Sequence, residues 1–250
     1  MNIILIVSDT FRYDNFFDRA AMPVRTPHLD AFSRRAVSME QFYTGSFPTI
    51  PQRTDMTAGR YGWPWFPWQP LDLSTRNSIP RILRKSGYVS QLICDCPHLF
   101  NSRFQNTFTA AEALRGQEGD LYRLRMNHPI DEVMPPEKTR SSKHLKGHNL
   151  VDMHRWMNRD WKGEEDCFPP RTARAAVEWL EENYLYESFF LWVDFFDPHE
   201  PWDPPEYMVK KYDPDYTGTP MLHPNYGRAD DYTADELHNL RAHYCAEAEL

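Results

Sequence analysis

The first residues of the chain limit its possible folds more than any other segment. Residues 2–7 form a continuous apolar run that ends abruptly at the polar residues 8–10. Runs of this kind are typical of parallel strands that are buried on both faces. A second run of the same type, residues 190–196, ends at Asp197. Because helical patterns lie between such strands, we expect an α/β fold with a mainly parallel sheet.

The wider pattern gives the order of the expected elements. We expect strands at residues 2–8, 88–95 and 188–195, and helices near residues 28–36, 51–58, 77–86, 170–184 and 233–249. Residues 101–168 are polar and charged, with few periodic stretches. We interpret them as a variable insertion that carries short helices above the sheet, and not as a separate domain.

An alcohol, a proline and an arginine lie close together at residues 49–53. Pro51 suits the first turn of a helix, and Gly59 is placed to end that helix. The free N–H groups and the positive end of the helix dipole would then face the Thr49 hydroxyl, with Arg53 one turn later on the same face. A helix start with this arrangement of groups favours the binding of tetrahedral oxyanions. The alternative is an ordinary threonine that caps a surface helix.

Asp9 follows the first expected strand directly. In open α/β sheets, the polar groups just past the carboxyl ends of the strands line the ligand crevice. A carboxylate at that place is a suitable oxygen ligand for a divalent cation. The alternative is a helix cap or a turn residue, which aspartate also favours.

Taken together, these segments resemble the sulfatase family of the alkaline phosphatase superfamily. The family signature is a nucleophile, any residue, proline, usually serine, and arginine, followed by a threonine-glycine-arginine run. The matching segments come in the family's order: Asp9 at a strand end, residues 26–30 at a helix start, Thr49 to Arg53, and the Gly59-Arg60 pair. The resemblance places Thr49 at the nucleophile and Arg53 at the signature arginine.

Two histidines extend the resemblance. His98 falls near the histidine of the family's second active-site loop, where it would donate to an ester oxygen. Residues 197–201 look like the family's proline-histidine-x-proline segment. His199 would then protonate the leaving oxygen or donate a hydrogen bond to the ester. The alternative for His199 is a turn histidine that packs on Trp202.

The resemblance implies a three-layer αβα sandwich and a metal-dependent hydrolase of sulfate or phosphate esters. Asp9, Thr10 and Thr49 would hold the divalent cation, Thr49 would attack, and Arg53 would stabilise the oxyanion. Ca²⁺ is the family's usual ion, although a threonine alkoxide on phosphorus would also suit Mn²⁺ or Zn²⁺. The substrate would be a sulfate or phosphate ester of a small molecule or a saccharide.

Three departures from the family pattern leave other functions open. Sulfatases carry cysteine or serine at the nucleophile, and Thr49 cannot yield their formylglycine aldehyde. Threonine nucleophiles occur in phosphodiesterase relatives, and Thr10 in place of a second aspartate resembles the phosphonate monoester hydrolase branch. Residues 95–98 lack the family's lysine. The alternatives are therefore a phosphodiesterase or phosphonate monoester hydrolase that uses Thr49, and a non-catalytic fragment that binds anions.

The remaining metal ligands of the family follow a strand beyond the helix that begins near Tyr232. The sequence ends within that helix, and no aspartate-histidine-glycine or aspartate-asparagine-glycine segment occurs in its 250 residues. We therefore expect residues 1–250 to be the N-terminal part of a sulfatase-type catalytic domain, with residues 101–168 as an insertion within it. Without the missing half, this chain alone is expected to be inactive.

Composition excludes several other classes. The net charge of −8 disfavours nucleic acid as a partner, because an acidic surface repels phosphate backbones. The longest apolar run is far shorter than the roughly 20 residues of a membrane span, and no signal peptide precedes it, so we expect a cytoplasmic protein without membrane contact. The four cysteines show no regular spacing, which predicts buried free thiols. Nothing in the sequence indicates the oligomeric state.

Overall fold

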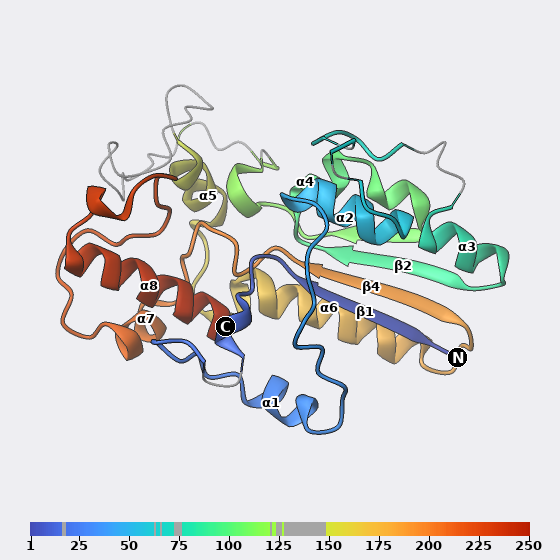
Figure 1. The fold of residues 1–250 in the computed structure, drawn as a ribbon, viewed down its shortest axis with the longest axis horizontal. Coiled ribbons are helices and arrows are strands. Elements are labelled where there is room, and N and C mark those ends of the chain that lie inside the picture. The colour runs from blue at the N-terminus through green and yellow to red at the C-terminus, as the bar shows by residue number, and fades with distance from the viewer. Residues whose placement is uncertain are drawn as a thin grey trace. The chain divides into compact units, whose positions relative to one another are not determined.

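The computed structural model describes residues 1–16, 19–62, 64–65, 67–72, 77–120, 122–123, 127 and 149–250 (Figure 1). These residues form two compact units. The first consists of Met1–Asp9, Ala36–Leu114 and Thr172–Phe195, and the second of Thr10–Arg35, Arg115–Arg171 and Phe196–Leu250. The insertion expected at residues 101–168 contributes to both units, and residues 128–148 within it lie outside the described part.

A parallel sheet forms the centre of the first unit. Its strands are β1 (Ile3–Ser8), β2 (Val89–Cys94), β3 (Ala110–Ala113) and β4 (Phe189–Phe195). In the described residues they pair in the order β1-β4-β2-β3, all parallel. The carboxyl ends of the strands therefore meet at one edge, where Ser8 lies beside Phe195 and Cys94 beside Asp194. This arrangement confirms the predicted α/β fold with a parallel sheet.

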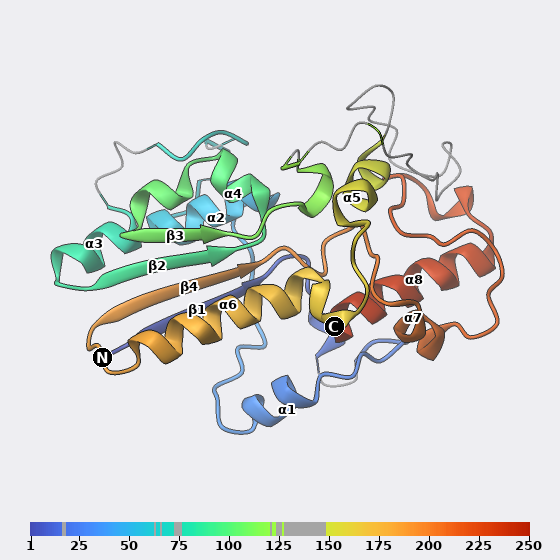
Figure 2. The same cartoon turned by 180° about the vertical axis from the view of Figure 1, so that it is seen from behind.

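Helices cover both faces of this sheet (Figures 1 and 2). On one face α6 (Phe168–Asn183) packs through Ala176 against Ile93, Leu191 and Val193. The opposite face carries α2 (Thr49–Ala58), α3 (Ile79–Lys85) and α4 (Pro97–Asn101). Within the first unit, the predicted three-layer αβα arrangement is therefore confirmed.

The prediction that the first strand is buried on both faces was wrong. Alternate residues of β1 face solvent, and Ile4 and Ile6 are 49% and 65% exposed. Both point to the α6 face, because they pair with Leu191 and Val193. The core cluster under α6 contains residues of β2 and β4 but neither Ile4 nor Ile6. The reason is that β1 is the edge strand of the described sheet.

The second unit is mainly helical. Its helices are α1 (Pro27–Ser33), α5 (Leu150–Asn158), α7 (Glu206–Tyr212) and α8 (Ala234–Glu249), and short 3-10 turns occur at Tyr13–Asn15, Gln117–Gly119, Glu164–Asp166 and Ala229–Asp231. One further 3-10 turn, Phe104–Thr107, belongs to the first unit. None of the described helices has the length and apolar character that a membrane span requires.

Packing and capping hold the helices of the second unit in place. Met208 and Val209 of α7 pack against Ala242 and Ala246 of α8. The start of α8 is fixed by a capping box, in which the Glu236 N–H donates to the Thr233 hydroxyl at 3.2 Å. All five helices and all three strands expected from the sequence are present, and α5 is one of the short helices expected within residues 101–168, whereas β3, α4 and α7 were not predicted.

Candidate active site

Thr49 is the first residue of α2 and is 7% exposed. The helix ends as predicted at Gly59, whose φ of 65° is left-handed and whose N–H donates to the Asp55 carbonyl at 2.8 Å. Within the described part of the chain, the Thr49 hydroxyl forms no hydrogen bond. The hydroxyl thus lies at a helix amino terminus, where the first backbone N–H groups have no partner within the helix.

Asp9 follows β1 at the carboxyl edge of the sheet and is 8% exposed. Its N–H donates to the Phe195 carbonyl at 2.9 Å, which continues the pairing of β1 and β4 by one residue. The structure therefore confirms that Asp9 stands at a strand end, as the sequence predicted. Asp9 and Thr49 both belong to the first unit.

Arg53 joins Asp9 to a second buried carboxylate. Its Nε and Nη2 donate to the two oxygens of Asp194 at 2.8 and 3.0 Å, and Nη2 also donates to Asp9 Oδ2 at 3.3 Å. The Arg53 and Asp194 side chains are 4% and 0% exposed. Burial alone would lower the pKa of Arg53. The charges of Asp194 and Asp9 and the hydrogen bonds to Asp194 outweigh that effect, so the pKa is raised.

This pairing differs from the role expected for Arg53. A guanidinium has five N–H groups, and a fourth one of Arg53 donates from Nη1 to Gln52 Oε1 at 2.6 Å. One N–H on Nη1 is left for a substrate oxygen. Arg53 therefore binds mainly the carboxylates of Asp9 and Asp194. Only its single remaining N–H donor is left to contact an oxyanion.

Asp194 was missed by the sequence analysis, which treated residues 190–196 as an apolar strand. The side chain is held by the Arg53 fork and by the Trp192 indole N–H, which donates to Asp194 Oδ2 at 2.9 Å. A carboxylate inside an apolar strand was the available signal, because a buried charge requires a partner. The identity of that partner depended on the fold.

The cysteines near this network are not reactive thiols. All four cysteines of the chain are free and buried, which confirms the prediction. Burial raises the pKa of both Cys94 and Cys96, and the Asp194 carboxylate raises the pKa of each further. Because the thiolate is the nucleophilic form, neither residue competes with Thr49 as a nucleophile.

His98 and His199 lie in different units. His98, in α4, contacts Trp68 edge-on with ring centroids 5.0 Å apart. His199 belongs to the second unit and stacks on Phe196 with ring centroids 4.1 Å apart, so its aromatic partner is not the Trp202 of the alternative interpretation. Its Nδ1 lies 2.8 Å from the Glu200 carbonyl. Only an N–H can donate to that carbonyl, so Nε2 is the nitrogen left for other contacts.

Thr10 has a strained backbone. Its φ of 56° is in the left-handed region, which β-branched residues rarely adopt. It belongs to the second unit, where its carbonyl accepts a hydrogen bond from the Tyr244 hydroxyl at 2.9 Å. The structure thus places the expected site residues Asp9, Thr49, Arg53 and His98 in one unit, and Thr10 and His199 in the other.

Comparison with known proteins identifies the family of this fold. The family model described as Sulfatase matches residues 1–243. The chain belongs to the sulfatase family. An arylsulfatase of Clostridium perfringens (strain 13 / Type A) is 24% identical over 242 residues, which cover 88% of this chain and 48% of that protein. The chain therefore spans about half the length of this curated relative.

Solved structures show the same fold. A phosphonate monoester hydrolase of Agrobacterium radiobacter matches 99% of the chain with a TM-score of 0.62 and 17% identity, and the match covers 56% of that protein. The enzyme SpPMH from Silicibacter pomeroyi has the same TM-score and coverage at 20% identity. Ps i-CgsB in complex with k-i-k-neocarrahexaose matches 99% of the chain and 51% of its own length, with a TM-score of 0.52 and 17% identity.

Sulfatases typically bind a divalent metal, and the donors of this chain can be compared with that need. Asp9 offers a carboxylate and Thr49 a hydroxyl, whereas both Asp194 oxygens accept from Arg53. Within the described residues, no three histidine, cysteine, aspartate or glutamate side chains are grouped to hold an ion. Since Ca²⁺ takes six to eight oxygen ligands, the described residues do not complete a calcium site.

Proposed function

We propose that this chain carries the nucleophile of a sulfatase-family hydrolase that cleaves sulfate or phosphate esters, with Thr49 as the attacking residue. The observation that carries the proposal is the buried Thr49 hydroxyl at the start of α2, in the same unit as the Asp9–Arg53–Asp194 network. The backbone N–H groups and dipole of that helix end stabilise negative charge that develops on the substrate.

In the proposed reaction, the Thr49 oxygen forms a bond to sulfur or phosphorus and its hydroxyl proton passes to solvent. The bond to the ester oxygen breaks, and that oxygen takes up a proton and leaves as an alcohol. Water then cleaves the Thr49 ester and restores the hydroxyl. Arg53 fixes the orientation of Asp9 and offers its one remaining Nη1 donor to the oxyanion. His199 was expected from the family resemblance to protonate the leaving oxygen, and since it belongs to the second unit this role stays a prediction. No step is assigned to a metal, because the described donors do not complete a site.

The nature of the nucleophile favours phosphorus over sulfur. Formylglycine forms from cysteine or serine, and Thr49 carries a β-methyl group that prevents that conversion. Direct attack by an alcohol is the usual route at phosphoryl centres. A phosphodiester or phosphonate monoester is therefore the preferred substrate class within the family. The neocarrahexaose bound to Ps i-CgsB makes a saccharide ester a reasonable natural form of that substrate.

Turnover of chromogenic esters tests the proposal directly. A version of the protein with the full length of its relatives would be assayed with 4-nitrophenyl sulfate, bis(4-nitrophenyl) phosphate and 4-nitrophenyl phenylphosphonate. We expect Thr49→Ala to abolish turnover of the phosphorus esters. Thr54→Ala is the matched control, because Thr54 lies on the same helix and donates to the Ile50 carbonyl. Equal turnover in the wild type and Thr49→Ala would refute the nucleophile assignment.

A non-catalytic role in anion binding is the second candidate. It is favoured by the incomplete metal donor set and by Arg53, which already neutralises part of the carboxylate charge. If the wild type hydrolyses none of the esters, titration with inorganic phosphate and sulfate distinguishes the two functions. Saturable binding that Thr49→Ala weakens would support the anion-binding role.

The predicted calcium site has its own test. Thermal unfolding would be followed with added Ca²⁺, Mn²⁺ or Zn²⁺ and compared with unfolding in chelator. A cation that binds at Asp9 raises Tm with the logarithm of its concentration above Kd, and Asp9→Asn removes the effect. No change in Tm with any of the three ions would contradict a metal site in this chain.

A further inference from the structure

The strained turn at Thr10 lies between two fixed points of the backbone. On one side the Asp9 N–H donates to the Phe195 carbonyl at 2.9 Å, and on the other the Thr10 carbonyl accepts from Tyr244. Among the described non-glycine residues with a positive φ, Thr10 is the only one with a β-branched side chain. Strained residues persist only where the surrounding structure holds them, and they are concentrated at active sites. The groups that hold Thr10 are therefore candidates for a role in function.

The Tyr244 hydroxyl, on α8, uses its full hydrogen-bonding capacity on this turn. It donates to the Thr10 carbonyl at 2.9 Å, and it accepts from the Arg12 N–H at 3.0 Å and from the Asn15 side-chain amide at 3.1 Å. A hydroxyl has one donor and two acceptor positions, so all three are occupied. All four residues belong to the second unit, where the segment after β1 lies beside the end of α8 (Figures 1 and 2). One hydroxyl group therefore fixes three points of this segment.

The surroundings keep the hydroxyl protonated and its partners in place. Burial raises the pKa of Tyr244 to about 12, so the O–H remains a donor at neutral pH. Asn15 is only 3% exposed, and a buried amide that lost its acceptor would destabilise the segment. The Asn15 N–H also donates to the Arg12 carbonyl at 3.1 Å, which closes a 3-10 turn. The hydrogen bonds of Tyr244 thus hold the whole segment, and not Thr10 alone.

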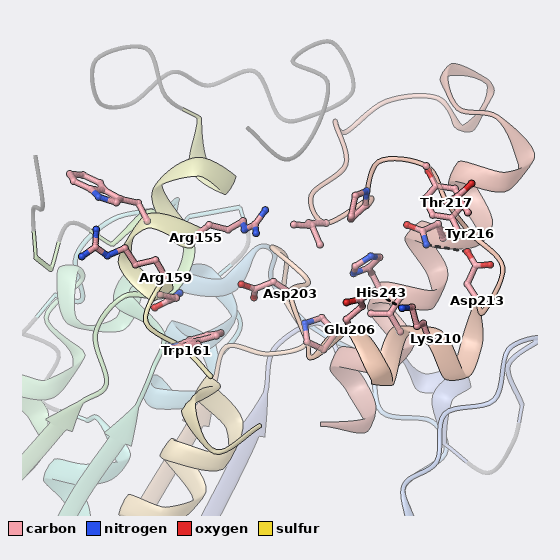
Figure 3. A pocket seen from close by; sticks show the side chains of 18 residues that line it. Arg155, Arg159, Trp161, Asp203, Glu206, Lys210, Asp213, Tyr216, Thr217 and His243 are labelled. Atoms are coloured by element: carbon pink, nitrogen blue, oxygen red, sulfur yellow. Dashed lines mark hydrogen bonds and ion pairs between the residues drawn. The ribbon is translucent and has the colours of Figure 1, made fainter. Parts of the chain in front are cut away.

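The Tyr244 ring contacts a second segment expected at the site. It packs edge-on against Trp202, with ring centroids 5.5 Å apart, and the Trp202 indole N–H donates to the Pro198 carbonyl at 2.8 Å. Pro198 precedes His199 directly. The neighbouring His243 extends into a pocket of about 740 Å³ beside α5, α7 and α8 (Figure 3), and its Nδ1 lies 3.0 Å from the Trp202 carbonyl. Two consecutive residues of α8 therefore hold Trp202, while the hydroxyl of one of them holds the strained turn.

We propose that Tyr244 is a positioning residue for ester cleavage, whose hydroxyl holds Thr10 in the left-handed conformation and thereby fixes the chain directly after Asp9. This role rests on the proposed function of Asp9 and Thr49, and Tyr244 itself does not contact the substrate. Without the hydroxyl, Thr10 returns to the negative φ that β-branched residues prefer, which turns its side chain relative to Asp9. A displacement of active-site groups by about 1 Å can lower a rate by roughly two orders of magnitude.

Hydrogen exchange of the 250-residue chain tests whether Tyr244 holds the turn. Tyr244→Phe removes the hydroxyl and keeps the ring that contacts Trp202. Tyr212→Phe is the matched control, because its hydroxyl also belongs to the second unit and donates to Glu249 Oε2 at 2.8 Å. We expect exchange at residues 11–15 to be at least about tenfold faster in Tyr244→Phe and unchanged in Tyr212→Phe. Equal exchange in the wild type and Tyr244→Phe would overturn the inference.

Turnover by a version with the full length of its relatives tests whether the position matters for the reaction. We expect Tyr244→Phe to lower kcat for the phosphorus esters by at least about tenfold and to change KM by less than about twofold. Circular dichroism at the assay temperature measures the folded fraction, so that a loss caused by unfolding is recognised. Asparagine adopts the left-handed region more readily than threonine. Tyr244→Phe should therefore cost at least about threefold less in kcat when Thr10→Asn is also present, whereas a role confined to α8 packing would not depend on residue 10.

The outcomes separate this inference from the proposed function. Loss of turnover in Thr49→Ala, with kcat of Tyr244→Phe within about twofold of the wild type, would overturn the positioning role alone. If the wild type of full length cleaves none of the esters, the proposed function fails and the positioning role for cleavage fails with it. A large loss of kcat in Tyr244→Phe that Thr10→Asn reduces, together with faster exchange of the turn, would support both.

Discussion

The buried ion pair of Arg53 and Asp194 allows a quantitative prediction. Replacing Arg53 by methionine removes both donors of the fork, at 2.8 and 3.0 Å, and leaves Asp194 with only the Trp192 N–H as a donor among the described residues. Because the Asp194 side chain is 0% exposed, water cannot replace the lost donors. Breaking one side of a buried ion pair costs about 3–5 kcal/mol, so we expect Arg53→Met to lower the free energy of unfolding by that amount.

The reciprocal variant should be similarly unstable, and the double variant should not. Asp194→Leu leaves the Arg53 guanidinium with the weaker 3.3 Å contact to Asp9 and the hydrogen bond to Gln52. In Arg53→Met, Asp194→Leu both charges are gone, and well-packed apolar replacements of buried pairs are often neutral. We therefore expect the double variant to lose less than about 2 kcal/mol, which gives a coupling energy of about 4 kcal/mol or more.

Urea unfolding at pH 7, followed by tryptophan fluorescence, measures these free energies. The control is Arg84→Met, an exposed substitution on α3 that should stay within about 0.5 kcal/mol of the wild type. The m value should be equal among variants, so that a shift in midpoint reports stability. Single variants that each cost under about 1 kcal/mol, or a double variant equal to their sum, would refute the reasoning.

Three other predictions concern stability. His243 has a pKa of about 4 in the folded protein and roughly 6.5 when unfolded, so its contribution is complete above pH 6.5 and falls by about 3 kcal/mol as the pH drops to 4. For His243→Gln, the free energy of unfolding plotted against pH should lack this part of the slope between about pH 6.5 and 4. A slope equal to that of the wild type would contradict the prediction. Thr233→Ala should cost about 1 kcal/mol in urea unfolding, because it removes the cap of α8, and no loss would show that the cap is dispensable. Leu191→Ala in the core should cost about 2–5 kcal/mol and the exposed Ile6→Ala under about 1 kcal/mol, and similar losses for both would contradict the edge position of β1.

Local patterns predicted the parts of the site that depend on local structure. The apolar run before Asp9 and the proline and glycine around α2 placed these residues at a strand end and at a helix start, as the structure has them. The pairing of Arg53 with Asp194 joins positions 141 residues apart, and no local pattern carries that information. Exposure of Ile4 and Ile6 was missed for the same reason, because the order of strands in the sheet decides it.

Short helices were missed for a different reason. A stretch such as α4, from Pro97 to Asn101, is too short to show a helical period, and packing decides its conformation. For α5 a signal was present. Asn149 and Asp152 form a capping box, in which the Asp152 N–H donates to Asn149 Oδ1 at 2.9 Å. An asparagine three residues before an aspartate would have identified this helix start.

The charges of the candidate site limit how it binds a substrate. Arg53 contributes one positive charge, and Asp9 and Asp194 contribute two negative charges, so this buried group carries a net charge of −1. The start of α2 adds roughly half a positive charge beside Thr49. The half charge of this helix end does not fully offset the net charge of −1 on the Asp9–Arg53–Asp194 group. A tetrahedral oxyanion would therefore be repelled by the site. An additional cation next to Asp9 would reverse the sign, which gives an electrostatic reason for the metal dependence expected of a sulfatase fold, independent of the identity of the ion.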